Sequence, residues 1–338
     1  SARRSTDSAM PACCPRSANR PPPEQTNPMR RISGSEGFPK GAAAPVVALG
    51  NFDGVHLGHR RIIERAVATA RSLGGSSVVY TFDPHPVRIL APAECPPLIE
   101  TLEQRLSSIE SLGVDFCVVE PFTAGLAAMG AEEFFLDIVA GRIGARAVVV
   151  GYDFTFGARR KGTADLMREL GAGRGIEVVR IEAQFLEDKL VSSTNIRRLI
   201  EHGEVCEAEK LLTRPYAIEG FIVPGRGIGR RLSARTANID SENECIPANG
   251  VYLTLAEIEG KSYPSVTSIG DNPTFPHAPF AIEAHLIDRD VDVMGKRIRL
   301  LFLRRMREQV AFASEEELKE QIMKDIEKAR EMHRDRDQ

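Results

Sequence analysis

The amino-acid sequence predicts an α/β protein of two domains: a parallel-sheet domain, then a small antiparallel β-barrel that ends in a helix. Three observations support this prediction. The 338 residues exceed what one hydrophobic core usually organises, and their 42% hydrophobic content is ordinary for a folded protein. Short apolar runs alternate with helical patterns up to about residue 213, which is typical of βαβ units. Beyond that point, short strand-like runs are separated by glycine, proline and asparagine.

The elements of the first domain follow from hydrophobic periodicity. Strands are expected at 46–49, 77–82, 116–119, 147–150 and 177–181. Helices are expected after His56, from Leu102, from Ala131, near Asp165, and at 194–201 and 205–212. Thr101 and Gln104 have the spacing of a capping box at the start of one of these helices. Together these elements predict a Rossmann-like parallel sheet over residues 45–213.

The second domain, residues 214–338, is expected to form the barrel and the final helix. Its strands are expected at 217–223, 251–258, 262–269, 281–287 and 297–303. A charged amphipathic pattern follows at 314–331, where Ser314 and Glu317 have the spacing of a second capping box.

Residues 1–44 are rich in proline, serine, arginine and glycine and lack apolar periodicity, so we expect a disordered tail. An organelle transit peptide is the alternative, although the prolines oppose the amphipathic helix of such peptides. The net charge of −3 argues against a general nucleic-acid-binding surface. No apolar run approaches the roughly 20 residues that span a bilayer, and the six cysteines include no CxxC pair. We expect a cytoplasmic protein with small-molecule substrates and neither nucleic acid nor membrane as a partner.

The strongest chemical signal is segment 50–59, GNFDGVHLGH, where a predicted strand passes into a helix. The start of a helix offers unpaired N–H groups and the positive end of a dipole, and His56 and His59 add donors for the same anion. Glycines let the backbone approach a bulky ligand. The segment therefore predicts a polyphosphate site; the alternative is two ordinary polar residues in a tight turn. The HxGH spacing is typical of nucleotidylyltransferases, in which the histidines stabilise charge on the phosphates during attack on the α-phosphate.

Three later segments support this class of chemistry. They are TFDPHP at 81–86, GYDFTFG at 151–157 and VSSTNIR at 191–197. Each follows a predicted strand or opens a predicted helix, which is the side of an open α/β sheet where ligands bind. Taken singly, they are also compatible with a proline turn, a glycine-bounded aromatic loop and a plain N-cap.

These four segments resemble, in the same order, the motifs of the bacterial bifunctional riboflavin kinase/FMN adenylyltransferase (FAD synthetase) family. The resemblance implies that His56 and His59 contact the phosphates of ATP. It implies that the rest of the ATP site consists of Gly50, Asn51, Phe52, Asp53, Gly58, Ser193, Thr194 and Arg197. It places the flavin beside Phe82, Asp153 and Phe154. A guanidinium such as that of Arg197 can also neutralise departing pyrophosphate in a bidentate way, a role that Mg²⁺ would share.

A second group of motifs lies in the barrel region. The Gly- and Arg-rich segment 225–232 can wrap phosphates, although such loops are often only solvated turns. It precedes the TAN sequence at 236–238, which resembles the PTAN motif of riboflavin kinases. The resemblance implies an ATP and Mg²⁺ site formed by Gly225, Gly229, Arg230, Thr236 and Asn238. Thr236 and Asn238 would be the metal ligands, since Mg²⁺ prefers oxygen.

Further along, segments 247–252, 268–275, 282–285 and 306–308 follow the riboflavin kinase pattern. The resemblance implies that Glu283 is the base that accepts the proton of the ribityl hydroxyl, and that Arg307 contacts the flavin or the nucleotide. Without the resemblance, a glutamate in such a strand is more often a solvent-facing residue. The predicted catalytic residues are thus His56, His59, Arg197 and Glu283.

The sequence departs from the kinase pattern at 233–235, where SAR stands in place of the usual GFP before Thr236. The leading prediction is a bifunctional enzyme that phosphorylates riboflavin to FMN and adenylylates FMN to FAD. ATP and flavins are its substrates, and Mg²⁺ is its metal. The altered residues leave open an FMN adenylyltransferase with a degenerate kinase-like barrel. A non-catalytic, flavin-responsive regulatory protein is a third possibility.

Overall fold

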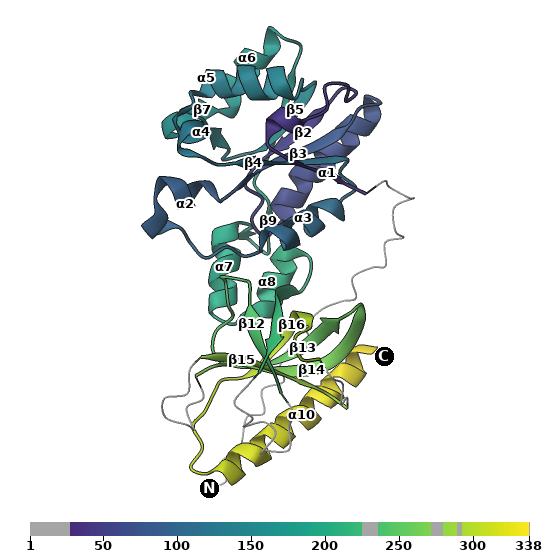
Figure 1. Ribbon diagram of the computed structural model, residues 1–338, viewed down its shortest axis with the longest axis vertical. Helices are drawn as coiled ribbons and strands as arrows, with labels where there is room; N and C mark the ends of the chain where they lie inside the picture. Colours follow the sequence, from purple (N-terminus) through teal and green to yellow (C-terminus); the bar gives the residue numbers. More distant parts are fainter. Residues whose placement is uncertain (1–27, 225–235, 272–279, 289–292, 338) are drawn as a thin grey trace.

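The computed structural model describes residues 28–224, 236–271, 280–288 and 293–337. Figure 1 shows the sheet domain at one end of the molecule and the barrel at the other. Helices α7 (Ser193–Glu201) and α8 (Val205–Leu212) lie between them. The predicted α/β fold class, with a parallel sheet, an antiparallel barrel and a terminal helix, is confirmed.

The sheet of the first domain has six parallel strands in the order β1-β4-β3-β2-β5-β8. They are β1 (Arg30–Ser33), β2 (Val46–Leu49), β3 (Ser77–Asp83), β4 (Phe116–Pro121), β5 (Ala147–Gly151) and β8 (Glu177–Ile181). The central strands β2 and β5 are apolar runs buried on both faces, as a parallel sheet covered by helices requires. This is why their positions could be predicted from the sequence.

Helices and short turns connect these strands. The helices are α1 (Leu57–Ser72), α2 (Pro86–Leu90), α3 (Leu102–Glu110), α4 (Ala124–Ala128), α5 (Ala131–Glu133), the π-helix η3 (Phe134–Arg142) and α6 (Ala164–Ala172). Short 3₁₀ turns occur at η1 (Ser35–Gly37), η2 (Pro92–Glu94) and η4 (Ala158–Arg160). Two small antiparallel pairs join β6 (Thr155–Phe156) to β7 (Gly162–Thr163) and β9 (Phe185–Leu186) to β10 (Lys189–Leu190). The capping box of Thr101 and Gln104 is confirmed.

The expectation that residues 1–44 form a disordered tail is wrong for residues 28–44. Strand β1 pairs in parallel with β4 at the edge of the sheet, and Met29 and Ile32 are buried. The sequence hid this strand because an edge strand of four residues buries only one of its side chains. Residues 1–27 lie outside the described residues.

The second domain is a closed antiparallel barrel with strand order β11-β12-β15-β14-β13-β16. Its strands are β11 (Tyr216–Val223), β12 (Ala237–Ser241), β13 (Gly250–Ile258), β14 (Lys261–Gly270), β15 (Ala281–Leu286) and β16 (Arg297–Arg307). Strand β12 was not predicted, because its sequence ANIDS offers only two apolar side chains, Ala237 and Ile239. Pairing with β11 and β15 on either side forms this strand, and β15 is remote in sequence.

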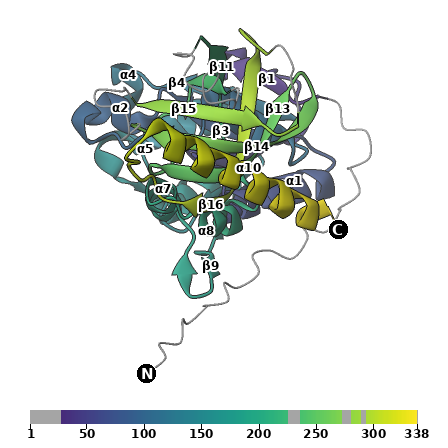
Figure 2. The ribbon, with the colours of Figure 1, turned by 90° about the horizontal axis from the view of Figure 1, so that it is seen from below.

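Helix α10 (Glu315–Asp337) lies along the outside of the barrel (Figure 2). Ile326 and Ala329 share a buried cluster with barrel residues such as Leu253. The predicted second capping box forms in part. The backbone N–H of Glu317 donates to Ser314 Oγ at 3.2 Å, but the Glu317 carboxylate accepts from Ala313 N. Among the residues that the structure describes, no helix is long and apolar enough to cross a membrane.

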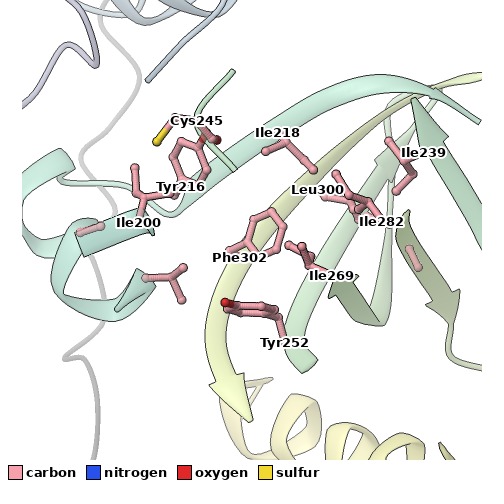
Figure 3. Packing of buried hydrophobic residues seen from close by; sticks show 14 of the residues in the cluster. Ile200, Tyr216, Ile218, Ile239, Cys245, Tyr252, Ile269, Ile282, Leu300 and Phe302 are labelled. Carbon is pink, nitrogen blue, oxygen red and sulfur yellow. The ribbon is translucent and has the colours of Figure 1, made fainter. Parts of the chain in front are cut away.

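One continuous hydrophobic core joins the barrel to the first domain. Figure 3 shows its packing, in which Phe302 lies between Tyr216 and Tyr252, and Tyr216 lies beside Cys245 and Ile200 of α7. The Tyr216 hydroxyl donates to the backbone oxygen of Cys245. The expected domain boundary at residue 213 therefore falls inside a packed core rather than in a linker, and the two halves support each other.

Candidate active site

Four sequence motifs of the first domain meet around one cavity of 1070 Å³. The cavity lies beyond the carboxyl ends of β2, β3 and β5, where α/β sheets bind ligands. The predicted residues that line it are Gly50, Asn51, Phe52, Asp53, His56, Gly58, His59, Phe82, Asp153, Phe154, Ser193, Thr194 and Arg197. The structure thus brings together every residue that the sequence assigned to adenylyl transfer.

A strained turn between β2 and α1 sets the positions of the two histidines. Phe52 and Val55 have positive φ angles of 52° and 36°, which side-chain-bearing residues rarely adopt. Phe52 is fully buried, and its ring meets the ring of His59 edge-on at a centroid distance of 5.3 Å. Phe52 therefore packs against His59, and its predicted contact with nucleotide stays a prediction.

His56 and His59 form a compact stacked pair at the start of α1. Their ring centroids are 3.6 Å apart, and His56 Nδ1 accepts a hydrogen bond from the backbone N–H of His59 at 3.3 Å. Burial, and next the Arg214 guanidinium, lower the pKa of His56 to about 4. Burial, and next His56, lower the pKa of His59 well below its ordinary value. Both rings are therefore neutral at pH 7, which explains how they can stack without repulsion.

The start of α7 faces the same cavity. Ser192 caps the helix by accepting from the backbone N–H of Asn195, and Ser193 Oγ donates to the backbone oxygen of Asp53 at 2.9 Å. Thr194 is exposed and lines the cavity. The positive ends of two helix dipoles, those of α1 and α7, thus meet at one site, and this arrangement favours a polyanion.

Asp53 and Arg197 were predicted to bind ATP, but in the structure their charged groups bind each other. Arg197 Nη2 lies 3.1 Å from Asp53 Oδ2, and both side chains are nearly buried. Arg197 Nε donates to the backbone oxygen of Pro97, and Asp53 Oδ1 accepts from Ile99 N at 3.0 Å. Burial raises the pKa of Asp53 to about 6, against the opposing effect of Arg197. Both residues line the cavity, and their ion pair links α7 to the turn between β2 and α1.

The glycines of the HxGH segment leave room for protein neighbours. A Cβ atom on Gly50 would lie 3.0 Å from the Phe52 ring, and one on Gly58 would lie 3.2 Å from the His56 ring. These positions are therefore restricted by packing within the site as well as by the predicted approach of a ligand.

One part of the cavity lining, here called its aromatic end, consists of aromatic and apolar side chains. Phe82 meets Phe122 edge-on at 5.5 Å, and Phe154 stacks on Phe156 at 5.8 Å. All four rings line the cavity, as does the apolar wall formed by α2. Asp153 is exposed on the lining. This surface suits a flat aromatic ligand such as a flavin ring.

Two supporting residues were not predicted. His85 caps α2 by accepting from Val87 N at 3.3 Å, and its Nε2 lies 3.3 Å from Asn51 Nδ2. Arg105 is buried and donates to the backbone oxygens of Asn51 and Phe82 at 2.9 and 3.0 Å. His85 belongs to the TFDPHP motif, so the sequence could have predicted it as a site residue. No pattern around Arg105 in the sequence marks it, because its partners Asn51 and Phe82 are remote in sequence.

The predicted kinase residues of the barrel lie on adjoining strands. Asn238 of β12 is directly opposite Glu283 of β15, and Glu283 is opposite Ser268 of β14. Directly paired residues share a face of a sheet, so these three side chains are neighbours. Burial raises the pKa of Glu283. Thr236 is half-buried just before β12. The predicted residues Gly225, Gly229 and Arg230 lie outside the described residues.

Arg307, expected to contact flavin or nucleotide, binds α10. Its guanidinium holds the Asp325 carboxylate through Nη2 at 2.7 Å and Nε at 3.0 and 3.1 Å. This contact anchors α10 to the barrel through an acidic partner 18 residues further along the chain. The predicted contact of Arg307 with flavin or nucleotide stays a prediction.

The described part of the chain contains no group of three or more His, Cys, Asp or Glu side chains that could hold a metal ion. Thr236 and Asn238 offer a different donor set of neutral oxygens. Such oxygens fit Mg²⁺ when phosphate groups supply the remaining ligands and the negative charge.

The fold and the cavity define a nucleotide-dependent transferase: a parallel sheet with two helix starts facing one cavity, one of them carrying paired histidines, joined to a closed barrel. A model of the FAD synthetase family matches residues 39–195, and a model of the riboflavin kinase family matches residues 212–333. The chain belongs to the bifunctional riboflavin kinase/FMN adenylyltransferase family.

Several relatives carry that same description. The protein from Bacillus subtilis is 36% identical over 85% of this chain and 92% of its own length. The protein from Escherichia coli K12 is 32% identical over the same shares of the two chains. A crystal structure from Streptococcus pneumoniae, described as a macrolide-efflux protein, is also similar, with 30% identity and a TM-score of 0.80. It covers 89% of this chain, and this chain covers 99% of it.

Proposed function

We propose that the protein makes FAD from riboflavin in two ATP-dependent steps, one in each domain. At the barrel, the terminal ribityl hydroxyl of riboflavin attacks the γ-phosphate of ATP, and ADP leaves. In the cavity of the sheet domain, a phosphate oxygen of FMN then attacks the α-phosphate of a second ATP. A new O–Pα bond forms, the bond from Pα to the bridging oxygen breaks, and pyrophosphate leaves with the electron pair.

The observation that carries the adenylyl step is the stacked histidine pair between two helix starts. His59 Nδ1 is shielded from solvent and has no hydrogen-bond partner among the described residues. A buried polar atom usually has a partner, and a phosphate oxygen could serve as that partner. Binding a polyanion would raise the pKa of both imidazoles. It would therefore favour their protonated forms, which donate stronger hydrogen bonds. The dipoles of α1 and α7 would stabilise the same charge during transfer.

The aromatic end of the cavity supports FMN as the acceptor. Phe82 and Phe154 form parts of two aromatic pairs on its lining, where an isoalloxazine ring would be buried. We propose that Gly50, Asn51, Gly58, Ser193 and Thr194 surround the ATP. The ion pair between Asp53 and Arg197 mainly fixes the turn that carries the histidines.

For the kinase step, we propose that Glu283 accepts the proton of the attacking hydroxyl. Its raised pKa makes it a better base than an exposed carboxylate. Asn238, directly opposite, and Thr236 would supply oxygen ligands to Mg²⁺, which neutralises charge on the phosphates of ATP. Gly225, Gly229 and Arg230 would complete this site, as the family resemblance implies.

We further propose that the adenylyl domain comprises residues 28–213 and the kinase domain residues 214–338. The helix-covered sheet and the closed barrel support this division. We place both reactions in the cytoplasm. The described cysteines Cys95, Cys117, Cys206 and Cys245 form no disulfide with one another, which is compatible with that compartment.

The test is to incubate the purified protein with ATP·Mg²⁺ and either riboflavin or FMN, and to separate the flavins by chromatography. We expect FAD from FMN, and both FMN and FAD from riboflavin. If FMN gave no FAD, the adenylyl proposal would fail. If riboflavin gave no FMN, the barrel would be a degenerate module, as the altered residues 233–235 allow.

The His59→Ala variant should lower FAD formation from FMN by at least about 100-fold, because a donor to the reacting phosphates is lost. It should leave riboflavin phosphorylation unchanged. Glu283→Ala should do the reverse. His202→Ala, at the far end of α7, is the matched control for loss of an imidazole. Equal loss of both activities in either variant would contradict two separate sites.

A further inference from the structure

Helix α2 forms one wall of the adenylyl cavity but has few contacts of its own. Val87 and Leu90 line the cavity, yet no residue of this helix is buried, and Leu90 is 61% exposed. The His85 cap holds its start, and the helix packs on α4 and on η2, the next turn of the chain. The position of this wall therefore also depends on what holds Arg88.

The partner of Arg88 comes from the other domain. Arg88 Nη2 lies 2.6 and 2.8 Å from the two carboxylate oxygens of Glu244, which belongs to the loop between β12 and β13 of the barrel. Glu244 Oε2 also accepts from the backbone N–H of Leu98 at 3.1 Å. One carboxylate of the barrel domain thus contacts both Arg88, in the wall, and the backbone of Leu98, further along the same segment.

The two neighbours of Glu244 are themselves fixed. Asn243 is buried, donates to Gln104 Oε1 at 2.7 Å and accepts from the backbone N–H of Glu219 at 2.8 Å. The backbone oxygen of Cys245 accepts from Tyr216 in the barrel core. These contacts fix the position of Glu244 relative to the barrel. We therefore infer that Glu244 sets the position of α2, and that α2 does not set the position of Glu244.

We propose that Glu244 is a positioning residue for adenylyl transfer, by which the kinase domain sets the place of the α2 wall against the flavin end of the neighbouring cavity. This inference rests on the proposed function. Val87 and Leu90 line the same cavity as Phe82 and Phe122, and α2 packs on α4, which follows Phe122 in the chain. We therefore expect Glu244 to affect the binding of FMN more than that of ATP, and it acts without touching either substrate.

The test compares Glu244→Gln with Glu242→Gln. Glu242 lies in the same loop and pairs with Arg297 at 2.8 Å, and its side chain is 39% exposed against 38% for Glu244. We expect Glu244→Gln to raise the KM for FMN about two- to five-fold, the range that loss of an exposed ion pair gives. The KM for ATP, the kcat for FAD formation and the riboflavin kinase constants should stay within experimental error of the wild type. Glu242→Gln should change none of them.

A second readout needs no substrate. Amide hydrogen exchange of the peptide spanning residues 83–98 should be faster in Glu244→Gln than in the wild type or in Glu242→Gln. The double exchange Arg88→Glu with Glu244→Arg should restore the KM for FMN relative to Arg88→Glu alone.

Identical exchange and identical KM in the two glutamine variants would overturn the inference. So would equal losses of both activities in Glu244→Gln, which would indicate general destabilisation. If the wild type made no FAD, the proposed function would fail, and the exchange comparison would still decide whether Glu244 holds α2.

Discussion

Replacing Arg197 with methionine should destabilise the protein in a way that depends strongly on pH. Methionine keeps an unbranched side chain of similar length but removes the guanidinium that lies 3.1 Å from Asp53. The carboxylate would then be buried with only backbone N–H partners. Loss of one member of a buried ion pair costs about 3–5 kcal/mol when the other stays charged.

Protonation of Asp53 limits that cost at low pH. In the wild type, the pKa of Asp53 is raised from 3.8 to about 6, so its ionisation costs stability as the pH rises through that window. Arg197 lowers this pKa, so the variant should have a still higher value. If the loss of Arg197 raises this pKa by about two pH units, the folded variant holds between pH 6 and pH 8 a proton that the wild type has lost. At about 1.4 kcal/mol per pH unit, the variant should lose about 2–3 kcal/mol more at pH 8 than at pH 5.

The assay is thermal unfolding followed by circular dichroism at pH 5 and pH 8. For a domain of this size, the extra loss corresponds to a fall in Tm that is about 4–12 °C larger at pH 8. Arg198→Met, an exposed neighbour on α7, is the matched control and should change Tm little at either pH. Asp53→Asn combined with Arg197→Met should regain most of the loss at pH 8. A fall in Tm that is equal at both pH values, or larger at pH 5, would refute the reasoning.

Two further predictions concern the two domains separately. The kcat/KM for FAD formation should fall below about pH 6 as Asp53 takes up a proton and its ion pair with Arg197 weakens. This fall should be smaller in Asp53→Asn, which keeps only the limb of the FMN phosphate, whose second pKa is also about 6. His56 has a pKa of about 4 and cannot produce this difference, so pH profiles from 5 to 9 with equal limbs near 6 would contradict the assignment. Gly220→Ala should unfold the barrel and abolish kinase activity, because its Cβ would lie 2.0 Å from the backbone oxygen of Asp240. Overpacking of this kind costs about 3 kcal/mol or more, whereas Gly41→Ala, with open space around it, should behave like the wild type in the same melts.

Much of the fold could be predicted because its signals are local. The buried strands β2 and β5 are continuous apolar runs, and the start of α3 is marked by a capping box within four residues. The strands that escaped prediction, β1 and β12, are short and bury few side chains. Strands of this kind form because neighbouring strands pair with them, and no pattern within their own sequence records those neighbours.

The candidate site shows the same division between features with local sequence signals and features without them. His56, His59 and their helix start are close in sequence, so the HxGH spacing alone determined their geometry and their suitability for phosphate. The predicted flavin-binding residues Phe82, Asp153 and Phe154 also line one cavity, because the carboxyl ends of parallel strands lie at one edge of the sheet.

What only the tertiary structure decided is which charged groups pair with each other. The sequence by itself determined the chemical types: two imidazoles at a helix start, arginines near phosphate motifs, and a glutamate in a barrel strand. It did not show that Arg197 binds Asp53, 144 residues away, or that Glu244 reaches 156 residues back to Arg88. The physical reason is that an ion pair depends on distance and burial in space, and folding alone brings such remote residues together.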